Sequence, residues 1–456
     1  MFWKQVSFAV RNLGRNKRRN AATASAIVLG YAGLVLLSGF VTRIEKFFRA
    51  TSVYFNQTGT LSVYKPGGVE KHLLFPKKYS ISETEQQDIR RIATELFPQA
   101  EAVGATLEGF TLIGNGCKTW PVKIRGIEPE LEKRLTNHAS VREFAPELIA
   151  ARKGSGLWQH PGIVPVVVTE KVARNLGKSK IRQPQSELES SGNTSTFDCS
   201  AINIEELVDN DTNIQLAART FSNDFSAIDA DIVGHYSSGL ELLEESTALI
   251  PLKDLQRLYE TEGVTNMVIF LPWDAIPELA AEKLSKALAN AGLELEVHHY
   301  RELSVNPFYA GFMNLIYVMS VFFLALSIGV VTLTVSDAMT MSVIERSREI
   351  GTLRALGFKQ KQITQTFALE GQILAILCLP MGFLIAFTTS ILVNAGKFYF
   401  EVPGVSTQVQ LNLAIDPLHC LWLGLMLMSL CSLSGWLTSI RTSRKEIVRL
   451  LSSHSS

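Results

Sequence analysis

Four apolar runs, each long enough to cross a bilayer, divide the chain. They cover Ala21–Val41, Tyr309–Ser336, Gly371–Gly396 and Pro417–Ile440, and none contains Asp, Glu, Lys or Arg. A bilayer core requires about 20 helical residues, so each run can span it. The pattern therefore predicts four transmembrane helices. Buried helices of a soluble core are the alternative, which four such runs in one chain disfavour.

Lys and Arg side chains flank these runs at alternate ends. Residues 1–20 contain six of them and no acidic residue, and the loop after the second run and the tail after the fourth run are also rich in Arg and Lys. Positive residues in short flanks favour the cytoplasmic side of a membrane. Four alternating spans then place both termini inside and residues 42–308 outside.

The long segment between the first two runs is acidic. Residues 42–308 contain 36 acidic and 28 basic residues, a formal charge of −8, whereas the whole chain has a formal charge of +1. The near-neutral total charge gives no argument for nucleic-acid binding. It is the sum of this acidic segment and of the basic residues that flank the apolar runs. A mean hydropathy of +0.15 is high for a soluble enzyme and is in keeping with a chain that lies partly in lipid.

Short periodic patterns in this acidic segment predict a mixed α+β domain. We expect a capping box at Ser82 and Glu85, followed by a helix whose apolar face includes Ile89. Other strands and helices are expected at Gly59–Tyr64, Val164–Val168, Glu170–Leu176, Ala248–Ile250, Pro251–Glu260, Asn266–Leu271, Pro277–Ala291 and Glu294–His299. The alternation is typical of layered packing. Lys178–Thr196 is polar and predicts a mobile loop.

Two segments beside the membrane extend the helical patterns. Phe2, Val6, Val10 and Leu13 recur at helical spacing among basic residues, which predicts a helix on the inner membrane face. A basic tail that only sets topology is the alternative. The second run would be about 42 Å long as a helix, so it either tilts or extends outward as a stalk. Arg43–Arg49 continues the first helix and predicts a stalk of two paired helices.

The five cysteines lie in two environments. Those in apolar runs are expected to be small buried side chains: Cys378, Cys420 and Cys431. Cys117 and Cys199 lie in the polar segment and either pair or remain free thiols. Gly114–Thr119 (GNGCKT) lacks the spacing of a phosphate-binding loop. The sequence therefore predicts no ATP site, catalytic site or metal site in this chain.

The loop after the second run carries the most distinctive motif. Glu345–Gly357 reads ERSREIGTLRALG, with Ile350, Leu353 and Leu356 at three-residue spacing among charged residues. Gly357 is a natural end for a helix. A short helix with one apolar edge and a charged face suits docking into a groove on a partner, whereas a solvated connector is the alternative.

This motif and its surroundings resemble the MacB/FtsX-like permease family of ABC transporters. The resemblance rests on Glu345–Ile363 with the following Glu370, on Trp3–Gly30, and on the order of one span, a large domain and three spans. It implies a non-catalytic membrane subunit that forms a homo- or heterodimer with a second permease chain. Two ATP-binding subunits would hold ATP and Mg, and nucleotide binding would move the outer domain.

The resemblance also implies a location and a domain plan. The chain would lie in a bacterial inner membrane with both termini cytoplasmic and contact membrane lipid. The plan is an amphipathic helix at 1–20, transmembrane helix 1 and stalk at 21–52, a periplasmic α+β domain at 53–302, stalk and transmembrane helix 2 at 303–343, a cytoplasmic coupling helix at 344–362, transmembrane helix 3 at 363–396, a short periplasmic loop at 397–416, transmembrane helix 4 at 417–440 and a cytoplasmic tail at 441–456.

Three sets of candidate functional residues follow. Candidates for contact with the ATPase are Glu345, Arg346, Arg348, Glu349, Ile350, Thr352, Leu353, Arg354, Leu356 and Gly357. Glu370 is a carboxylate in apolar sequence, expected either to contact the basic N-terminal helix or to reach interfacial water. Ala22, Ala26, Gly30 and Gly33 form a stripe of small residues, which serves either packing within the bundle or a seam between two chains.

The substrate class stays open. Val63–Gly67, Lys78–Ile81 and Ile232–Gly239 look most similar to the lipoprotein-releasing branch of the family. A MacB-like exporter of drugs or peptides and an FtsX-like relay to a periplasmic partner are the alternatives. A lipoprotein or a periplasmic adaptor is a further partner that the resemblance allows.

Overall fold

The computed structural model describes residues 17–160, 162–182, 212–346, 350–352, 355, 357 and 359–443. These residues form two compact units. The membrane unit comprises residues 1–44, 314–398 and 410–456, and the α/β domain comprises residues 45–313 and 399–409. The predicted N-terminal amphipathic helix falls almost entirely outside the described residues, as do Cys199, most of the predicted mobile loop and the C-terminal tail.

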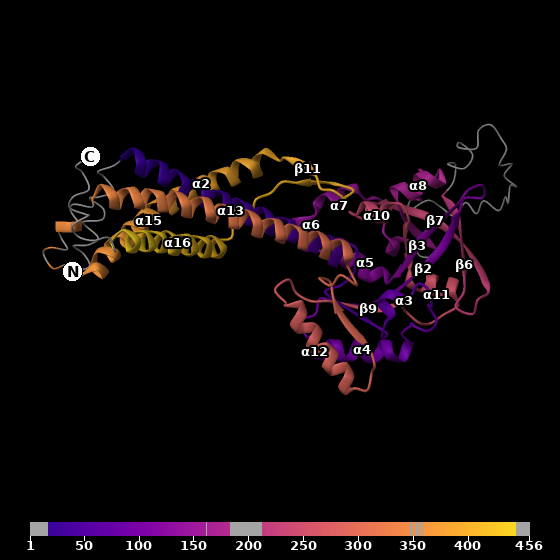
Figure 1. The fold of residues 1–456 in the computed structure, drawn as a ribbon. Coiled ribbons are helices and arrows are strands. Elements are labelled where there is room, and N and C mark those ends of the chain that lie inside the picture. Colours follow the sequence, from indigo (N-terminus) through magenta and orange to yellow (C-terminus); the bar gives the residue numbers. More distant parts are fainter. Residues whose placement is uncertain are drawn as a thin grey trace. The chain divides into compact units, whose positions relative to one another are not determined.

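The membrane unit is built on four long helices (Figure 1). They are α2 (Lys17–Arg49), α13 (Pro307–Glu345), α15 (Gln360–Gly396) and α16 (Pro417–Ser443). Each contains an apolar window long enough to cross a membrane, which confirms the prediction of four spans. Their shared core includes Ile27 and Val35 of α2, Val335 of α13, Ala375 of α15 and Leu427 of α16, all almost fully buried.

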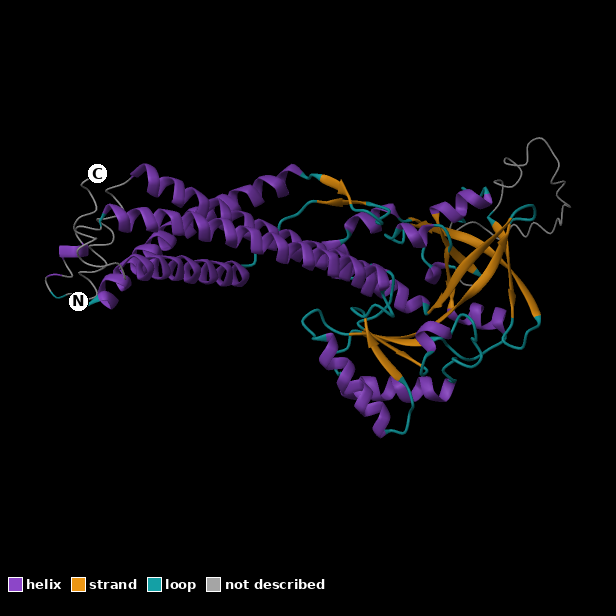
Figure 2. Cartoon of the chain, viewed as in Figure 1, coloured by secondary structure: helices purple, strands orange, loops and turns teal. Residues whose placement is uncertain are grey.

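The α/β domain contains nearly all of the strands (Figure 2). Its helical elements are η1 (Ala50–Phe55), α3 (Gly68–Lys71), α4 (Glu83–Leu96), α5 (Pro129–Thr136), α6 (Ala139–Phe144), α7 (Pro146–Ala151), η2 (Leu157–Gln159), α8 (Glu170–Leu176), α10 (Glu241–Glu244), α11 (Leu252–Tyr259) and α12 (Pro277–Asn290). Its strands are β1 (Leu61–Tyr64), β2 (Ala102–Gly114), β3 (Thr119–Ile127), β4 (Lys153–Gly154), β5 (Pro165–Thr169), β6 (Asn213–Arg219), β7 (Phe225–Tyr236), β8 (Thr247–Pro251), β9 (Asn266–Phe270) and β10 (Glu296–His299). The mixed α+β fold class is therefore confirmed.

The ten strands form one mixed sheet. Its order is β10-β1-β9-β2-β3-β8-β5-β7-β4, and β6 pairs with both β2 and β7. The β3–β8 and β5–β7 pairs are parallel, and the other pairs are antiparallel. The residues Gly114–Thr119 connect β2 and β3 at the end of their antiparallel pairing, so they serve as a hairpin turn.

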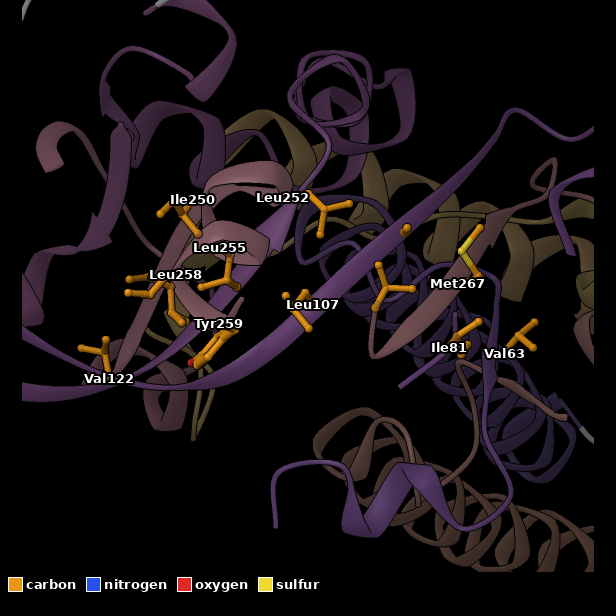
Figure 3. Close-up of a cluster of buried hydrophobic side chains, with 14 of the residues drawn as sticks. Val63, Ile81, Leu107, Val122, Ile250, Leu252, Leu255, Leu258, Tyr259 and Met267 are labelled. Atoms are coloured by element: carbon orange, nitrogen blue, oxygen red, sulfur yellow. The ribbon is translucent and has the colours of Figure 1, made fainter. Parts of the chain in front are cut away.

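Helices cover the sheet through their apolar faces. Leu255 and Leu258 of α11 are fully buried against the sheet, in one cluster with Leu107 of β2 and Val122 of β3 (Figure 3). Gly126 on β3 permits this contact, since a Cβ there would lie 3.0 Å from the side chain of Leu255. The sheet and its helices therefore share one core.

The predicted elements of the domain agree with the structure within a few residues, and the capping box at Ser82 is present with Glu85. The hairpins β2–β3 and β6–β7 were not predicted. The predicted short loop at 397–416 contains two strands that the sequence did not predict. It folds into a hairpin of β11 (Tyr399–Glu401) and β12 (Gln408–Gln410).

Candidate functional site

The predicted ATPase-coupling motif, Glu345–Gly357, begins at the last residue of α13 and ends before α15. Arg346 follows α13 directly, and its Nη1 donates to Glu370 Oε1 of α15 at 2.9 Å. The side chains of Arg346 and Glu370 are only 13% and 5% exposed, so this is a buried ion pair. The pair joins the second and third spans next to the motif, and Arg346 is therefore not a freely exposed contact residue.

This pair corrects the expectation for Glu370. Its carboxylate does not reach interfacial water, because the whole residue is only 3% exposed. Moving a charged carboxylate out of water costs free energy unless an opposite charge pairs with it, and Arg346 supplies that charge for Glu370. The basic N-terminal segment lies outside the described residues, so the expected contact with that segment remains untested.

Apolar contacts also hold the motif to the spans. Ile350 is 3% exposed and packs in one cluster with Val343 of α13 and with Ile363 and Phe367 of α15. Ile350 therefore anchors the motif within the chain and is not offered to a partner. Gly357 has a φ of +94°, in the left-handed region that favours glycine, as expected for the end of the motif.

The remaining motif residues divide into two groups. Glu345 and Thr352 are exposed. The other candidates, Arg348, Glu349, Leu353, Arg354 and Leu356, lie outside the described residues. The described part thus combines a buried anchor, Ile350, with two exposed residues.

The small-residue stripe of α2 has two environments. A Cβ on Gly30 would lie 2.8 Å from Val331 Cγ2 of α13, so Gly30 allows these two helices to approach closely. A Cβ on Gly33 would meet no described atom within 4 Å, and Ala22 is exposed, whereas Ala26 is half-buried. Gly30 therefore serves packing within the bundle, while Gly33 and Ala22 face away from the described residues.

The sequence did not predict how the first helix enters the α/β domain. At Ala50, α2 changes into the π-helix η1, and all six residues of η1 are buried. Tyr54 of η1 stacks on His138 at 4.0 Å and donates to Leu271 O. Single π-helical turns are rare and often occur at functional sites. The turn marks the joint between helix and domain.

Aromatic and charged side chains surround this joint. The guanidinium of Arg49 lies 4.2 Å from the ring centre of Trp273. Arg301 pairs with Glu45 of α2 at 3.3 Å and with Glu278 of α12 at 3.0 Å. Phe48 of α2 lies 4.7 Å from Phe312 of α13, centre to centre, so the two stalk helices are side by side within the domain unit.

A buried charge network supports the joint from the sheet. Glu108 of β2 accepts from Arg125 Nε of β3 at 2.8 Å and pairs with Lys123 Nζ at 2.7 Å. Burial alone would raise the pKa of Glu108, but the charges of Lys123 and Arg125 outweigh burial and hold its pKa well below the ordinary value. Arg125 Nη1 also donates to the main-chain oxygen of Asn56, one residue after η1. The network therefore ties the end of the first helix to two strands.

The cysteines behave in two ways. Cys378, Cys420 and Cys431 are buried free thiols, as expected for apolar runs. Cys117 is disulfide-bonded, which favours the pairing alternative over the free thiol for this residue.

Comparison with known proteins finds a family that matches the last three long helices. Residues 317–447 match the family described as FtsX-like permease C-terminal, so the match covers most of α13, the coupling motif, α15 and α16. No curated protein matches the chain.

Two solved structures show a weak likeness. The extracellular domain of the noncanonic ABC-type transporter YknZ from Gram-positive bacteria aligns at 11% identity, covering 52% of this chain and 99% of that one, with a TM-score of 0.27. The periplasmic region of MacB from Actinobacillus actinomycetemcomitans aligns at 8% identity, covering 53% of this chain and 91% of that one, with a TM-score of 0.30. Likenesses of this size carry no information on ligands or partners.

Proposed function

We propose that this chain, whose residues 317–447 match the FtsX-like permease C-terminal family, is a permease of the ABC transporter class that couples ATP hydrolysis by a separate ATPase subunit to motion of its α/β domain. The domain is on the outer side of the membrane in this proposal, and its motion extracts or exports a lipoprotein or another envelope substrate. The chain itself is not a catalyst. ATP and Mg are bound by the partner.

The buried Arg346–Glu370 pair is the observation that carries the proposal. A docking segment transmits force only if it is fixed to the spans that must move. The ion pair and the buried Ile350 fix the coupling motif to α13 and α15. Where the first helix enters the α/β domain, η1 and Arg125 fix the end of α2 to the sheet. The contacts of the coupling motif and the contacts of α2 with the sheet therefore both support a path along which motion passes between the motif and the α/β domain.

The assembly we propose contains two permease chains and two ATP-binding subunits in a bacterial inner membrane. Both termini and the coupling motif are cytoplasmic, because the basic flanks lie there under the positive-inside tendency. Membrane lipid contacts the exposed apolar side chains of the second span, such as Phe322 and Leu333. A periplasmic adaptor or a lipoprotein is the expected partner of the α/β domain.

Purification from native membranes tests this proposal. The chain carries a C-terminal tag, is extracted in mild detergent, and its bound proteins are identified by mass spectrometry. The matched control reverses two charges of the coupling motif, Glu349→Arg and Arg354→Glu. We expect an ATP-binding subunit with the native chain and its loss from the control.

The co-purifying proteins also decide between substrate classes. A bound lipoprotein supports lipoprotein release, whereas a bound cell-wall hydrolase supports an FtsX-like relay, and a drug- or peptide-stimulated ATPase supports a MacB-like exporter. If the native chain retains no ATPase under any mild condition, the proposal is wrong and a membrane receptor becomes the better hypothesis.

A further inference from the structure

The turn after β7 lies between two segments that are far apart in the sequence. It comprises Ser237–Leu240, and Gly239 within it has a φ of +78°. A Cβ on Gly239 would lie 3.0 Å from the side chain of Thr51 in η1. On its other side, Gly239 O accepts from the main-chain nitrogen of Ser406, in the β11–β12 hairpin, at 3.3 Å. The turn therefore contacts both the end of the first helix and the loop between the third and fourth spans.

One buried carboxylate connects this turn to the hairpin. Glu244 of α10 is 6% exposed. Its Oε1 accepts from the hydroxyl groups of Ser237 and Ser406, each at 2.9 Å, and from the main-chain nitrogen of Ser238 at 2.6 Å. The hydroxyls of Ser237 and Ser406 are 2.8 Å apart. Hydrogen bonds to a charged acceptor are stronger than neutral ones, so this carboxylate binds the hairpin to the turn.

The hairpin is fixed by main-chain and apolar contacts as well. Glu241 N donates to Gly404 O at 2.9 Å. Val402 and Val409 are 4% and 1% exposed, although the hairpin is short. Gly404 has a φ of +78°, and a Cβ there would lie 2.7 Å from the ring of Phe308 in α13. These contacts are those of a docked segment and not of a solvated connector.

The same turn is bonded to the end of the first helix. Asn56 Nδ2 donates to Ser238 O at 2.9 Å. Ser238 in turn donates to Glu244, which holds Ser406. A continuous series of hydrogen bonds therefore runs from Asn56 through Ser238 and Glu244 to Ser406, entirely within the α/β domain unit.

We infer that Glu244 is a positioning residue that ties the loop between the third and fourth spans to the α/β domain, so that the domain moves three of its membrane connections together. Two of these are covalent continuations of the domain into α2 and α13, and the third is this docked hairpin. The inference rests on the proposed function, because it assigns the path by which motion of the domain reaches α15 and α16. It requires the hairpin to stay docked throughout the ATP cycle.

A reversible cross-link tests whether the hairpin stays docked. In the full chain with its co-purified ATPase, Ser237→Cys and Ser406→Cys are introduced together, and each single variant is the control. We expect the pair to form a disulfide to the same extent with and without ATP. We also expect the oxidised complex to retain the ATPase rate of the reduced complex. Loss of hydrolysis on oxidation, reversed by a thiol reductant, would overturn the inference, because the hairpin would then have to leave the domain.

A second variant tests the role of the carboxylate. Glu244→Ala should accelerate amide hydrogen exchange in residues 399–409 by about tenfold or more, because four donors lose one buried acceptor. Glu241→Ala removes an exposed carboxylate of the same helix but keeps the main-chain nitrogen that donates to Gly404, so it should leave the exchange unchanged. Adding the cysteine pair to Glu244→Ala should restore slow exchange when oxidised and not when reduced. Unchanged exchange in Glu244→Ala would contradict the assignment.

The readouts separate this inference from the proposed function. Hydrogen exchange and cross-linking report on the chain even when no ATPase is bound. Absence of an ATPase from the native chain overturns the proposed function, whereas a hairpin that exchanges fast in the native chain overturns the inference alone. Wild-type chain treated with the same reductant controls for reduction of the disulfide at Cys117.

Discussion

The α/β domain and the membrane unit stabilise their interiors with different chemistry. In the domain, Glu108 lies on a strand between partners on the neighbouring strand, Lys123 and Arg125. In the membrane unit, helices meet at small residues, and the carboxylate of Glu370 pairs with Arg346. The domain thus gathers several charges in one buried network, whereas the membrane unit relies on close helix packing with a buried charge pair at one end.

This difference relates to the environment of each unit. Water surrounds an outer domain during folding, so burial of apolar surface forms its core and a compensated charge network can fix its register. In lipid, apolar burial between helices contributes little, and close packing at small residues replaces it. We therefore expect removal of a buried charge to destabilise the domain more than the membrane unit, and an added methyl group at a helix contact to destabilise the membrane unit.

The largest effect should come from Glu108→Gln in the domain. The substitution leaves Lys123 and Arg125, whose side chains are 32% and 22% exposed, without the buried carboxylate. It should therefore reduce the free energy of unfolding by about 3 kcal/mol. Thermal unfolding of the full chain in detergent measures the change. Glu294→Gln, on an exposed residue, is the matched control. A loss in the variant no larger than in the control would show that the network does not stabilise the domain.

Glu370→Ala should have the next largest effect, in the membrane unit. Arg346 then lacks its carboxylate, but its long side chain can extend toward water at the end of the span, so we expect a loss of about 2 kcal/mol. The amount of co-purified ATPase should fall as well, since the coupling motif loses its anchor. Gln365→Ala, exposed on the same helix, is the control. The exchange Arg346→Glu with Glu370→Arg should restore part of both losses, and no restoration would argue against a direct pair.

Alanine substitutions at two glycines of α2 separate the effect of helix packing on stability from the effect of helix propensity. Gly30→Ala should destabilise the membrane unit by about 1–2 kcal/mol, because the new methyl group would collide with Val331. Gly33→Ala meets no described atom within 4 Å and should be neutral or stabilising by up to about 1 kcal/mol. Melting temperatures of the two variants provide the test. A destabilised Gly33→Ala would instead indicate that a second chain packs there.

The pH dependence of the Glu108 network should be the smallest effect. Because the folded domain lowers the pKa of Glu108 below its ordinary value of 4.5, its stabilising contribution is present above that value and is lost as the pH falls through the folded pKa. The stability gap between wild type and Glu108→Gln should therefore narrow below pH 4.5, and a constant gap would contradict the shift.

Features set by nearby residues were predictable from the sequence. The spans follow from uninterrupted apolar runs, and the start of α4 follows from Ser82 and Glu85, whose side chain and main chain bond reciprocally. Ile350, Leu353 and Leu356 predicted an apolar edge on the coupling motif, but not its direction. Burial of Ile350 depends on Phe367 of the next helix, and no local pattern contains that contact.

Features set by distant residues were not predictable. The β2 strand buries Glu108 and exposes Phe110, so its side-chain pattern does not alternate simply between apolar and polar. Glu244 and Ser406 are 162 positions apart. Serine and glutamate in polar sequence usually contact water, so only the fold reveals that these two side chains meet.

The π-helical turn at η1 makes the number of residues in this segment structurally important. Each residue of an α-helix advances the chain by about 100° around its axis, whereas the turn at Ala50–Phe55 accommodates an extra residue without unwinding. Deleting one residue there would close this wider turn and change the direction in which Tyr54 leaves the helix relative to Phe48, although neither ring is removed. Natural variants should therefore tolerate substitutions in this segment far better than insertions or deletions, and their spacing between the two rings should stay constant.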